Sequence, residues 1–479
     1  MYVRLSGMTG IALLTVSMGW GAMTFKLDGE YLTFSSRKTS ITNFLNGFVQ
    51  AGVKVQVDPS LQFNLGGTVI HQPVEKVLEE LIEPYSYLVL WDQMKTPLGD
   101  WLKLSEIRIF KPGEAWKVQA YQPEDGNFRV ARGALPDSPE FVADELLLTL
   151  NDLANIDAFR TLLQQIGGSV IDSLPELGIY RIRLPAGTNV PALIEQLKNY
   201  PIVSRIEPNY IARISDPAVD GAGAASFQSP NIREGMAPVA VLDSGLISGS
   251  GIDDAVVSRY DAVVPGRALT DEAGHGTQMA MIASGAVDPD GAESLVGDGA
   301  PIVAIRTFDD NGITSSFTLM RAIQHAYNEG ARVVNLSWGS NTDSDFIRSA
   351  LAQAERKGMV VVASAGNEPT GKPVYPSAYP TVISVGALDG QGDRWSDSNF
   401  GDFVMIDAPG MATFPVGHNG PPGRYAGTSI SSAYVARNIA NYLTENPRAT
   451  PSQVRNAVQK TFSTQKFTGE KLRTWVGEN

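Results

Sequence analysis

The second half of the chain alternates short apolar runs with amphipathic stretches. Almost wholly apolar runs of this length are typical of strands buried on both faces of a parallel sheet. The runs are residues 239–242, 302–305, 333–336, 360–364 and 382–385. Between them, stretches such as 317–329 and 344–357 carry apolar residues at helical spacing. Strands that alternate with helices predict a doubly wound, mostly parallel α/β sheet with right-handed crossovers, which we assign to residues 236–479.

Two shorter segments upstream each predict a small α+β domain. Residues 23–113 and residues 140–213 both indicate a β-α-β-β-α-β order, although the two segments share no obvious sequence. The pattern of the first segment resembles the N-terminal modules of secretins and TonB-dependent receptors, which dock other proteins. That resemblance implies a protein partner for this module, and a small α+β domain of another use is an equal alternative.

The remaining segments predict a signal peptide and two linkers. Residues 1–22 contain an apolar stretch that is too short to span a bilayer and ends with the small residues Gly19 and Gly21. These features favour a signal peptide over a buried first strand or helix. Residues 114–139 and 214–235 are rich in small and polar residues, so we expect exposed linkers there, with a processing region in the second. No later run is long enough for a transmembrane anchor.

Composition narrows the chemistry. The chain has 38 basic and 51 acidic residues, a net charge of −13, and no basic run, which excludes nucleic acid as a partner class. The absence of cysteine excludes disulfides, thiol catalysis and cysteine-ligated zinc. Histidine chemistry is confined to His71, His275, His325 and His418. We expect His71 at a turn, His325 on a helix surface and His418 in a solvated, glycine-rich loop.

An acidic loop raises the question of a metal. Asp288, Asp290 and Glu293 could contribute to a calcium site. Calcium takes six to eight oxygen ligands, however, and three acidic residues are more typical of a solvated loop. We therefore predict no metal and no cofactor.

Three polar residues stand at junctions where a predicted strand or loop meets a predicted helix. Asp243 follows the apolar strand 238–242, His275 lies between two glycines, and Ser429 follows Gly-Thr, directly before a helix. Taken singly, the three indicate only a turn, a structural histidine and a helix N-cap. Reactive groups of α/β sheets collect at the carboxyl ends of the strands, so the ordered set of Asp, His and Ser predicts nucleophilic catalysis.

The segments around these residues resemble a known family. VAVLDSGL, GHGTQMA and GTSISSAYVA are similar to the three signature segments of the subtilases, and VVASAGNE at 361–368 is similar to a fourth. The resemblance covers residues 236–463. It implies a serine endopeptidase acting on proteins or peptides, with Ser429 as nucleophile, His275 as general base and Asp243 orienting the imidazole.

The same resemblance implies further site residues. Asn367 and the backbone N–H of Ser429 would bind the oxyanion. The substrate residue before the cleaved bond would lie in a pocket formed by two short segments, namely Ser337, Trp338 and Gly339 together with Ala365 and Gly366. The sequence departs from the family at Ala433, Tyr434 and Arg437, where proline, histidine and glycine are common. None of these is a catalytic group, and we expect Arg437 to alter packing.

Residues 140–213 resemble the subtilase propeptide in size and element order, and LGIYRIRLP and YPIVSRIEPNYIA are similar to its strand and terminal segments. The resemblance implies an intramolecular inhibitor whose tail lies in the active site. These features together predict a self-processed precursor that is secreted or periplasmic. An alternative is an inactive protease fold that serves as a scaffold for the docking module, but the intact triad argues against it.

Overall fold

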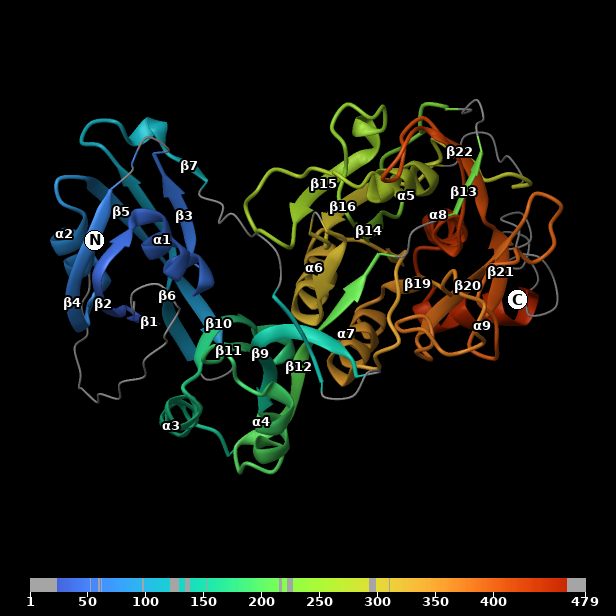
Figure 1. Ribbon diagram of the computed structural model, residues 1–479. Coiled ribbons are helices and arrows are strands. Elements are labelled where there is room, and N and C mark those ends of the chain that lie inside the picture. The colour runs from blue at the N-terminus through green and yellow to red at the C-terminus, as the bar shows by residue number, and fades with distance from the viewer. Residues whose placement is uncertain are drawn as a thin grey trace. The chain divides into compact units, whose positions relative to one another are not determined.

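The computed structural model describes residues 24–462, except for residues 52, 59–60, 62, 97–98, 121–128, 134–137, 152, 215–217, 222–226, 293–298 and 310. The predicted signal peptide, residues 1–22, lies outside these residues. The chain forms two compact units, one of residues 1–126 and 142–209, the other of residues 127–141 and 210–479 (Figure 1). No helix in the part of the chain described is long and apolar enough to span a membrane.

Among the residues described, the first module of unit one has two small sheets and two α-helices. Figure 1 shows it in blue. The three-stranded sheet contains β1 (Thr24–Asp28), β2 (Tyr31–Ser40) and β4 (Asn64–Pro73). The four-stranded sheet contains β5 (Ser86–Thr96), β6 (Gly99–Phe110), β3 (Lys54–Val57) and β7 (Gln119–Ala120). The helices are α1 (Ile41–Gln50) and α2 (Val74–Ile82). Their apolar faces meet a core in which the rings of Phe34, Phe44 and Phe48 pack edge to face.

The second module, of which residues 142–209 belong to unit one, has the predicted β-α-β-β-α-β order. It runs through β9 (Glu140–Leu150), α3 (Ile156–Ile166), β10 (Ser169–Leu174), β11 (Ile179–Arg183), α4 (Val190–Leu197) and β12 (Val203–Arg213). The strands form an antiparallel sheet in the order β10-β11-β9-β12. Each helix begins at an asparagine whose side chain accepts a backbone N–H of the first turn, Asn155 for α3 and Asn189 for α4.

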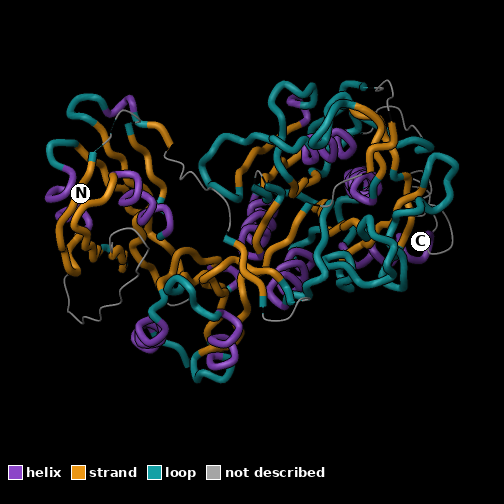
Figure 2. Tube along the Cα trace, viewed as in Figure 1, coloured by secondary structure: helices purple, strands orange, loops and turns teal. Residues whose placement is uncertain are grey.

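Unit two is built on a seven-stranded parallel sheet in the order β15-β16-β14-β18-β19-β20-β21. The strands are β14 (Val239–Asp243), β15 (Val256–Asp261), β16 (Ile302–Arg306), β18 (Val333–Leu336), β19 (Val360–Ser364), β20 (Val382–Leu388) and β21 (Ile406–Pro409). Figure 2 shows the strands in orange and the helices in purple. Along the chain, α-helices lie between β15 and β16, between β16 and β18 and between β18 and β19. The parallel sheet with these helices confirms the predicted doubly wound α/β class.

In the described part of unit two, five α-helices accompany this sheet: α5 (His275–Ser284), α6 (Ser316–Asn328), α7 (Asp345–Arg356), α8 (Thr428–Glu445) and α9 (Pro451–Phe462). The helices α5 and α8 pack against one another, and both contribute to the main apolar core beside Val239 and Val241 of β14. Alternate residues of a strand point to opposite faces, so Ala240 and Leu242 face the other side of the sheet. The carboxyl end of β14 and the N-termini of α5 and α8 carry the predicted triad residues.

Three features of unit two go beyond the sequence prediction. The strands β22 (Met411–Phe414) and β23 (Gly423–Ala426) form a small antiparallel sheet with β13 (Ala218–Gly221). Of these three strands, β13 lies within residues 214–235, where we expected an exposed linker. The short β8 (Val130–Arg132) likewise falls within 114–139, and β17 (Ile313–Ser315) precedes α6.

Candidate active site

Asp243 and His275 form a direct, buried pair. Asp243 ends a strand of five buried residues and is 1% exposed, and His275 begins α5 and is 0% exposed. The distance between Asp243 Oδ1 and His275 Nδ1 is 2.7 Å. A buried carboxylate needs a partner, and the imidazole supplies one. The hydrogen bond at Nδ1 fixes the orientation of the ring, which leaves Nε2 as the nitrogen that can take or give a proton.

The glycines beside His275 allow close approach of the protein's own backbone. A Cβ on Gly276 would lie 2.4 Å from Gly245 O, and a Cβ on Gly274, whose φ is +82°, would lie 2.1 Å from Gly417 O. A side chain at either position would clash with that backbone, so the two glycines let the start of α5 contact the segment after β14 and the loop before β23.

Ser429 lies in the first turn of α8, where the helix dipole favours negative charge. Its Oγ donates to Ser337 O at 3.2 Å, and Ser337 Oγ is 3.3 Å from Ser429 O. These reciprocal contacts tie the end of β18 to the start of α8. Ser337 therefore supports the position of Ser429.

The loop after β19 holds Asn367 next to the same helix start. Asn367 Oδ1 accepts hydrogen bonds from Thr428 N at 3.0 Å and from Thr428 Oγ1 at 2.9 Å, so the amide nitrogen is the end directed elsewhere. Asn399, which sequence reasoning missed, fixes this loop by donating from Nδ2 to Ala365 O and from its backbone N to Gly366 O. No sequence motif marks Asn399, because its role depends on a contact across more than thirty residues.

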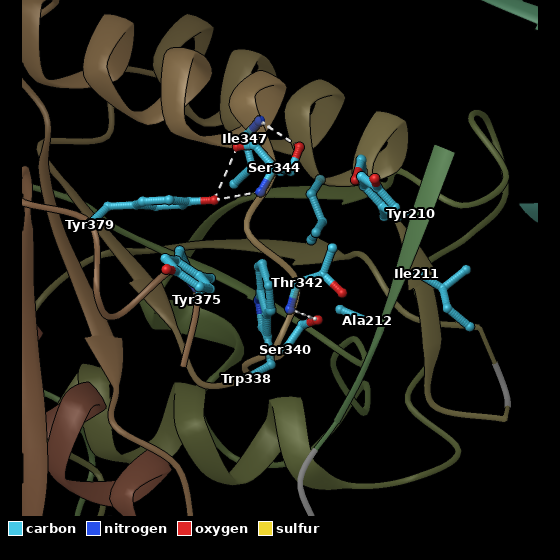
Figure 3. A pocket seen from close by; sticks show the side chains of 13 residues that line it. Tyr210, Ile211, Ala212, Trp338, Ser340, Thr342, Ser344, Ile347, Tyr375 and Tyr379 are labelled. Atoms are coloured by element: carbon cyan, nitrogen blue, oxygen red, sulfur yellow. Dashed lines mark hydrogen bonds between the residues drawn. The ribbon is translucent and has the colours of Figure 1, made fainter. Parts of the chain in front are cut away.

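A pocket on unit two is bordered by the end of β12 (Figure 3). Trp338 lines it and is almost wholly buried, with its ring packed edge to face against Phe308. Opposite, the Tyr379 hydroxyl exchanges hydrogen bonds with the backbone of Ser344, and burial raises the pKa of this phenol. Of the five residues predicted to bind substrate, only Trp338 lines this pocket. Gly339 forms an isolated β-bridge with Arg213 at the end of β12.

The other histidines and the acidic loop are placed as follows. His71 lies within β4 and stacks on Tyr31, so the expectation of a turn there is wrong. His418 is buried beside His275, which corrects the expectation of a solvated residue. His325 is half-buried and stacks on Tyr260. In the acidic loop, Asp288 pairs with Arg437 and Asp290 with Arg424, whereas Glu293 lies outside the described residues. Among the residues described, no group of acidic or histidine side chains is arranged to hold a metal.

The fold and this site define a class of protein. A parallel α/β sheet presents a buried Asp–His pair, and a serine begins a helix packed against the helix that carries the histidine. This combination is that of a serine peptidase of the subtilisin type.

Comparison with known proteins agrees. Residues 236–474 match the subtilase family, and residues 131–209 match the fervidolysin N-terminal prodomain. Thermitase of Thermoactinomyces vulgaris is 30% identical over 244 residues, which cover 50% of this chain and 87% of thermitase. A thermophilic serine proteinase of Bacillus sp. (strain AK1) is 28% identical over 335 residues, covering 67% of this chain and 82% of that protein.

A solved structure shares the fold. Fervidolysin from Fervidobacterium pennivorans aligns with a TM-score of 0.58 and 22% identity, covering 73% of this chain and 64% of that chain. The chain belongs to the subtilase family. It is a subtilisin-like serine endopeptidase that acts on protein substrates and carries a fervidolysin-like prodomain.

Proposed function

We propose that the chain is a secreted precursor that cleaves itself after its prodomain and then hydrolyses other proteins. Ser429 attacks the scissile carbonyl, and His275 takes the hydroxyl proton and passes it to the leaving amine. Asp243 holds the imidazole and stabilises its cation. Asn367 and the backbone N–H of Ser429 donate to the oxyanion of the tetrahedral intermediate.

One observation carries the self-processing step: the chain lies along unit two as two short strands separated by a few residues. Residues 211–213 pair antiparallel with residues 313–315 of β17, and Arg213 bridges to Gly339. Residues 218–221 of β13 pair antiparallel with β23, and β23 leads through Gly427 into Ser429. Extended peptides are recognised by peptidases through such main-chain pairing.

The two strands delimit the cleaved bond. β17 and Gly339 hold the chain up to Ile214, whose N–H donates to Gly312 O at 3.1 Å, and β23 holds it again from Ala218. We therefore assign the scissile bond to the sequence Ile214–Ala218, a narrower interval than the linker itself. Tethering gives this segment a high local concentration at the site, which favours cleavage within one molecule.

The test compares the wild-type protein with Ser429→Ala by N-terminal sequencing and intact mass. We expect the wild type to yield a fragment that begins within residues 215–218, and Ser429→Ala to remain the longer precursor and to leave casein intact. Ser431→Ala is the matched control, because this serine lies in the same helix but donates to Ala408 O. Trimming of Ser429→Ala at the same place in a protease-free preparation would contradict self-processing.

Secretion is tested separately from catalysis. Residues 1–22 have the pattern of a signal peptide, and a relative, the minor extracellular protease Epr of Bacillus subtilis, is named as extracellular. We expect the Ser429→Ala precursor to leave the cytoplasm and to lose residues 1–22, and the protein made without these residues to stay inside. Export of the truncated protein to the same extent would disprove the signal.

A further inference from the structure

A buried carboxylate outside the triad joins the strand that carries Asp243 to the helix that carries His275. Asp271 lies in the loop before α5 and is 7% exposed. Its Oδ1 accepts hydrogen bonds from Ser244 Oγ at 2.7 Å and from Gly274 N at 2.8 Å. Its Oδ2 accepts from Thr277 N at 2.8 Å and from Thr277 Oγ1 at 2.7 Å. Four donors thus converge on two oxygens, an arrangement that suits an acceptor-only carboxylate.

Ser244 connects this carboxylate to the catalytic one. The backbone N of Ser244 donates to Asp243 Oδ1 at 2.8 Å, while its hydroxyl donates to Asp271. The same hydroxyl accepts a hydrogen bond from Gly276 N at 2.8 Å. Ser244 therefore contacts Asp243, Asp271 and the first turn of α5 together.

These contacts fix the backbone on both sides of His275. The first N–H groups of a helix have no partner within the helix, and the N-cap residue of α5 is Gly274, which has no side chain to supply one. Asp271 and Ser244 take over that function from outside the helix, since they accept the N–H groups of Gly274, Gly276 and Thr277.

We propose that Asp271 is a positioning residue for proteolysis: through Ser244 and the first turn of α5, it holds the His275 imidazole at hydrogen-bonding distance from Asp243. The inference rests on the proposed roles of His275 and Ser429. A general base must stay aligned with the group whose proton it takes, so even a small displacement of α5 costs rate rather than substrate affinity.

The first test is Asp271→Asn. In this variant an NH₂ group replaces one of the two carboxylate oxygens, and each oxygen accepts two hydrogen bonds in the wild type. The NH₂ group cannot accept from those donors, so two of the four hydrogen bonds are lost. We expect kcat to fall roughly ten- to hundredfold and KM to change by less than about twofold. We also expect the acid limb of the kcat/KM profile to move to lower pH. The reason is that a looser Asp243 contact and a missing carboxylate both disfavour the protonated imidazole.

Two titratable groups face His275 from the elements packed against it, namely Asp243 at the end of β14 and His418 in the loop before β23. Both stay unchanged in Asp271→Asn. A shift of the acid limb therefore reports on the altered position of the His275 imidazole and on the lost charge of Asp271. A merely structural defect lowers the number of active molecules without moving that limb.

A second pair of variants guards against misfolding of the first. Thr277→Val is nearly isosteric and removes the hydroxyl bonds to Asp271 Oδ2 and from Ile247 N, and Thr277→Ser restores the hydroxyl. We expect Thr277→Val to lower kcat in the same sense and Thr277→Ser to return it to the wild-type value. Asp389→Asn is the matched control, because Asp389 also accepts two backbone N–H groups, from Gln391 and Asp393, but in a distant turn.

The concentration of active sites is counted in every variant with a serine-reactive phosphonate, so that kcat refers to competent molecules. Wild-type protein that is not labelled would refute the proposed function itself. A labelled Asp271→Asn protein with wild-type kcat and an unmoved acid limb would overturn the positioning role. So would equal losses in Thr277→Val and Thr277→Ser.

Discussion

His418 places a second imidazole beside that of His275. The two ring centroids are 4.9 Å apart, and His418 is 6% exposed. Its loop is tied to the His275 segment by Gln278 Nε2, which donates to Val416 O, and by Asn419 N, which donates to Ala273 O. Burial, with a further contribution from the charge of His275, lowers the pKa of His418 to about 3.

This histidine makes the stability of unit two depend on pH. The unfolded chain binds a proton at His418 below about pH 6.5, whereas the folded protein does so only near pH 3. The stability that neutral His418 gives to the folded protein is therefore fully present above pH 6.5 and is lost as the pH falls towards 3. The free energy of unfolding therefore decreases as the pH falls from 6.5 to 3, with a slope that corresponds to about one proton per molecule. In His418→Phe we expect this slope to be absent. Urea unfolding of the Ser429→Ala background at several pH values measures it, and an unchanged slope would contradict the assignment.

At the scale of elements, Arg437 links the two helices that carry the histidine and the serine. From α8 its Nη2 pairs with Asp288 Oδ1 at 2.6 Å, and its Nη1 donates to Ile282 O at 3.3 Å in the last turn of α5. A cation at a helix C-terminus is favoured by the helix dipole. The arginine that we expected only to alter packing therefore stabilises the end of α5 opposite His275.

Arg437→Ala should lower the free energy of unfolding by about 2–4 kcal/mol, because it leaves a partly buried Asp288 and a helix-end carbonyl without this cation. Thermal unfolding of the phosphonate-inhibited enzyme measures the loss. Arg424→Ala is the control, since the Arg424–Asp290 pair is about one third exposed and should cost less than about 1 kcal/mol. Equal losses in the two variants would contradict the role of burial.

At the scale of the whole molecule, most of the prodomain and the peptidase sheet belong to separate compact units. Glu145 is central to the prodomain: it is fully buried and bound by Arg181, Arg183 and Asn209. Burial by itself would raise the pKa of Glu145, but the two arginines and the Asn209 amide hold it below the ordinary 4.5. Ionised Glu145 thus stabilises unit one above pH 4.5, and this contribution disappears as the pH falls through the lower folded value.

Glu145→Gln should therefore loosen unit one alone, because it leaves two arginines without their buried counter-charge. Hydrogen exchange on the full-length Ser429→Ala protein can resolve the units. We expect faster exchange over residues 142–209 at neutral pH, and no change in the parallel sheet of unit two. Equal acceleration in both units would mean that their stabilities are coupled.

The sequence by itself determined the parallel sheet and the positions of Asp243, His275 and Ser429 along it. Apolar runs between helical stripes mark buried parallel strands, and each residue of the proposed triad lies in a local motif at a strand end or helix start. The first module was less well predicted. In the long hairpin β5–β6, Leu88, Leu90 and Leu102 are apolar but exposed. Both faces of the hairpin therefore carry apolar residues, and the sequence shows no clean alternation of apolar and polar positions.

Only the tertiary structure decided which distant groups support the site. Asp271 accepts backbone N–H groups around His275, and Arg437 links the end of α5 to Asp288. His418 lies more than a hundred residues along the chain from His275 but is buried beside it. Asn399 likewise acts through the loop that precedes Asn367. Each contact depends on which loops meet at the edge of the folded sheet. Hydrophobic periodicity specifies how an element faces the core, but it does not specify which polar group it will meet there.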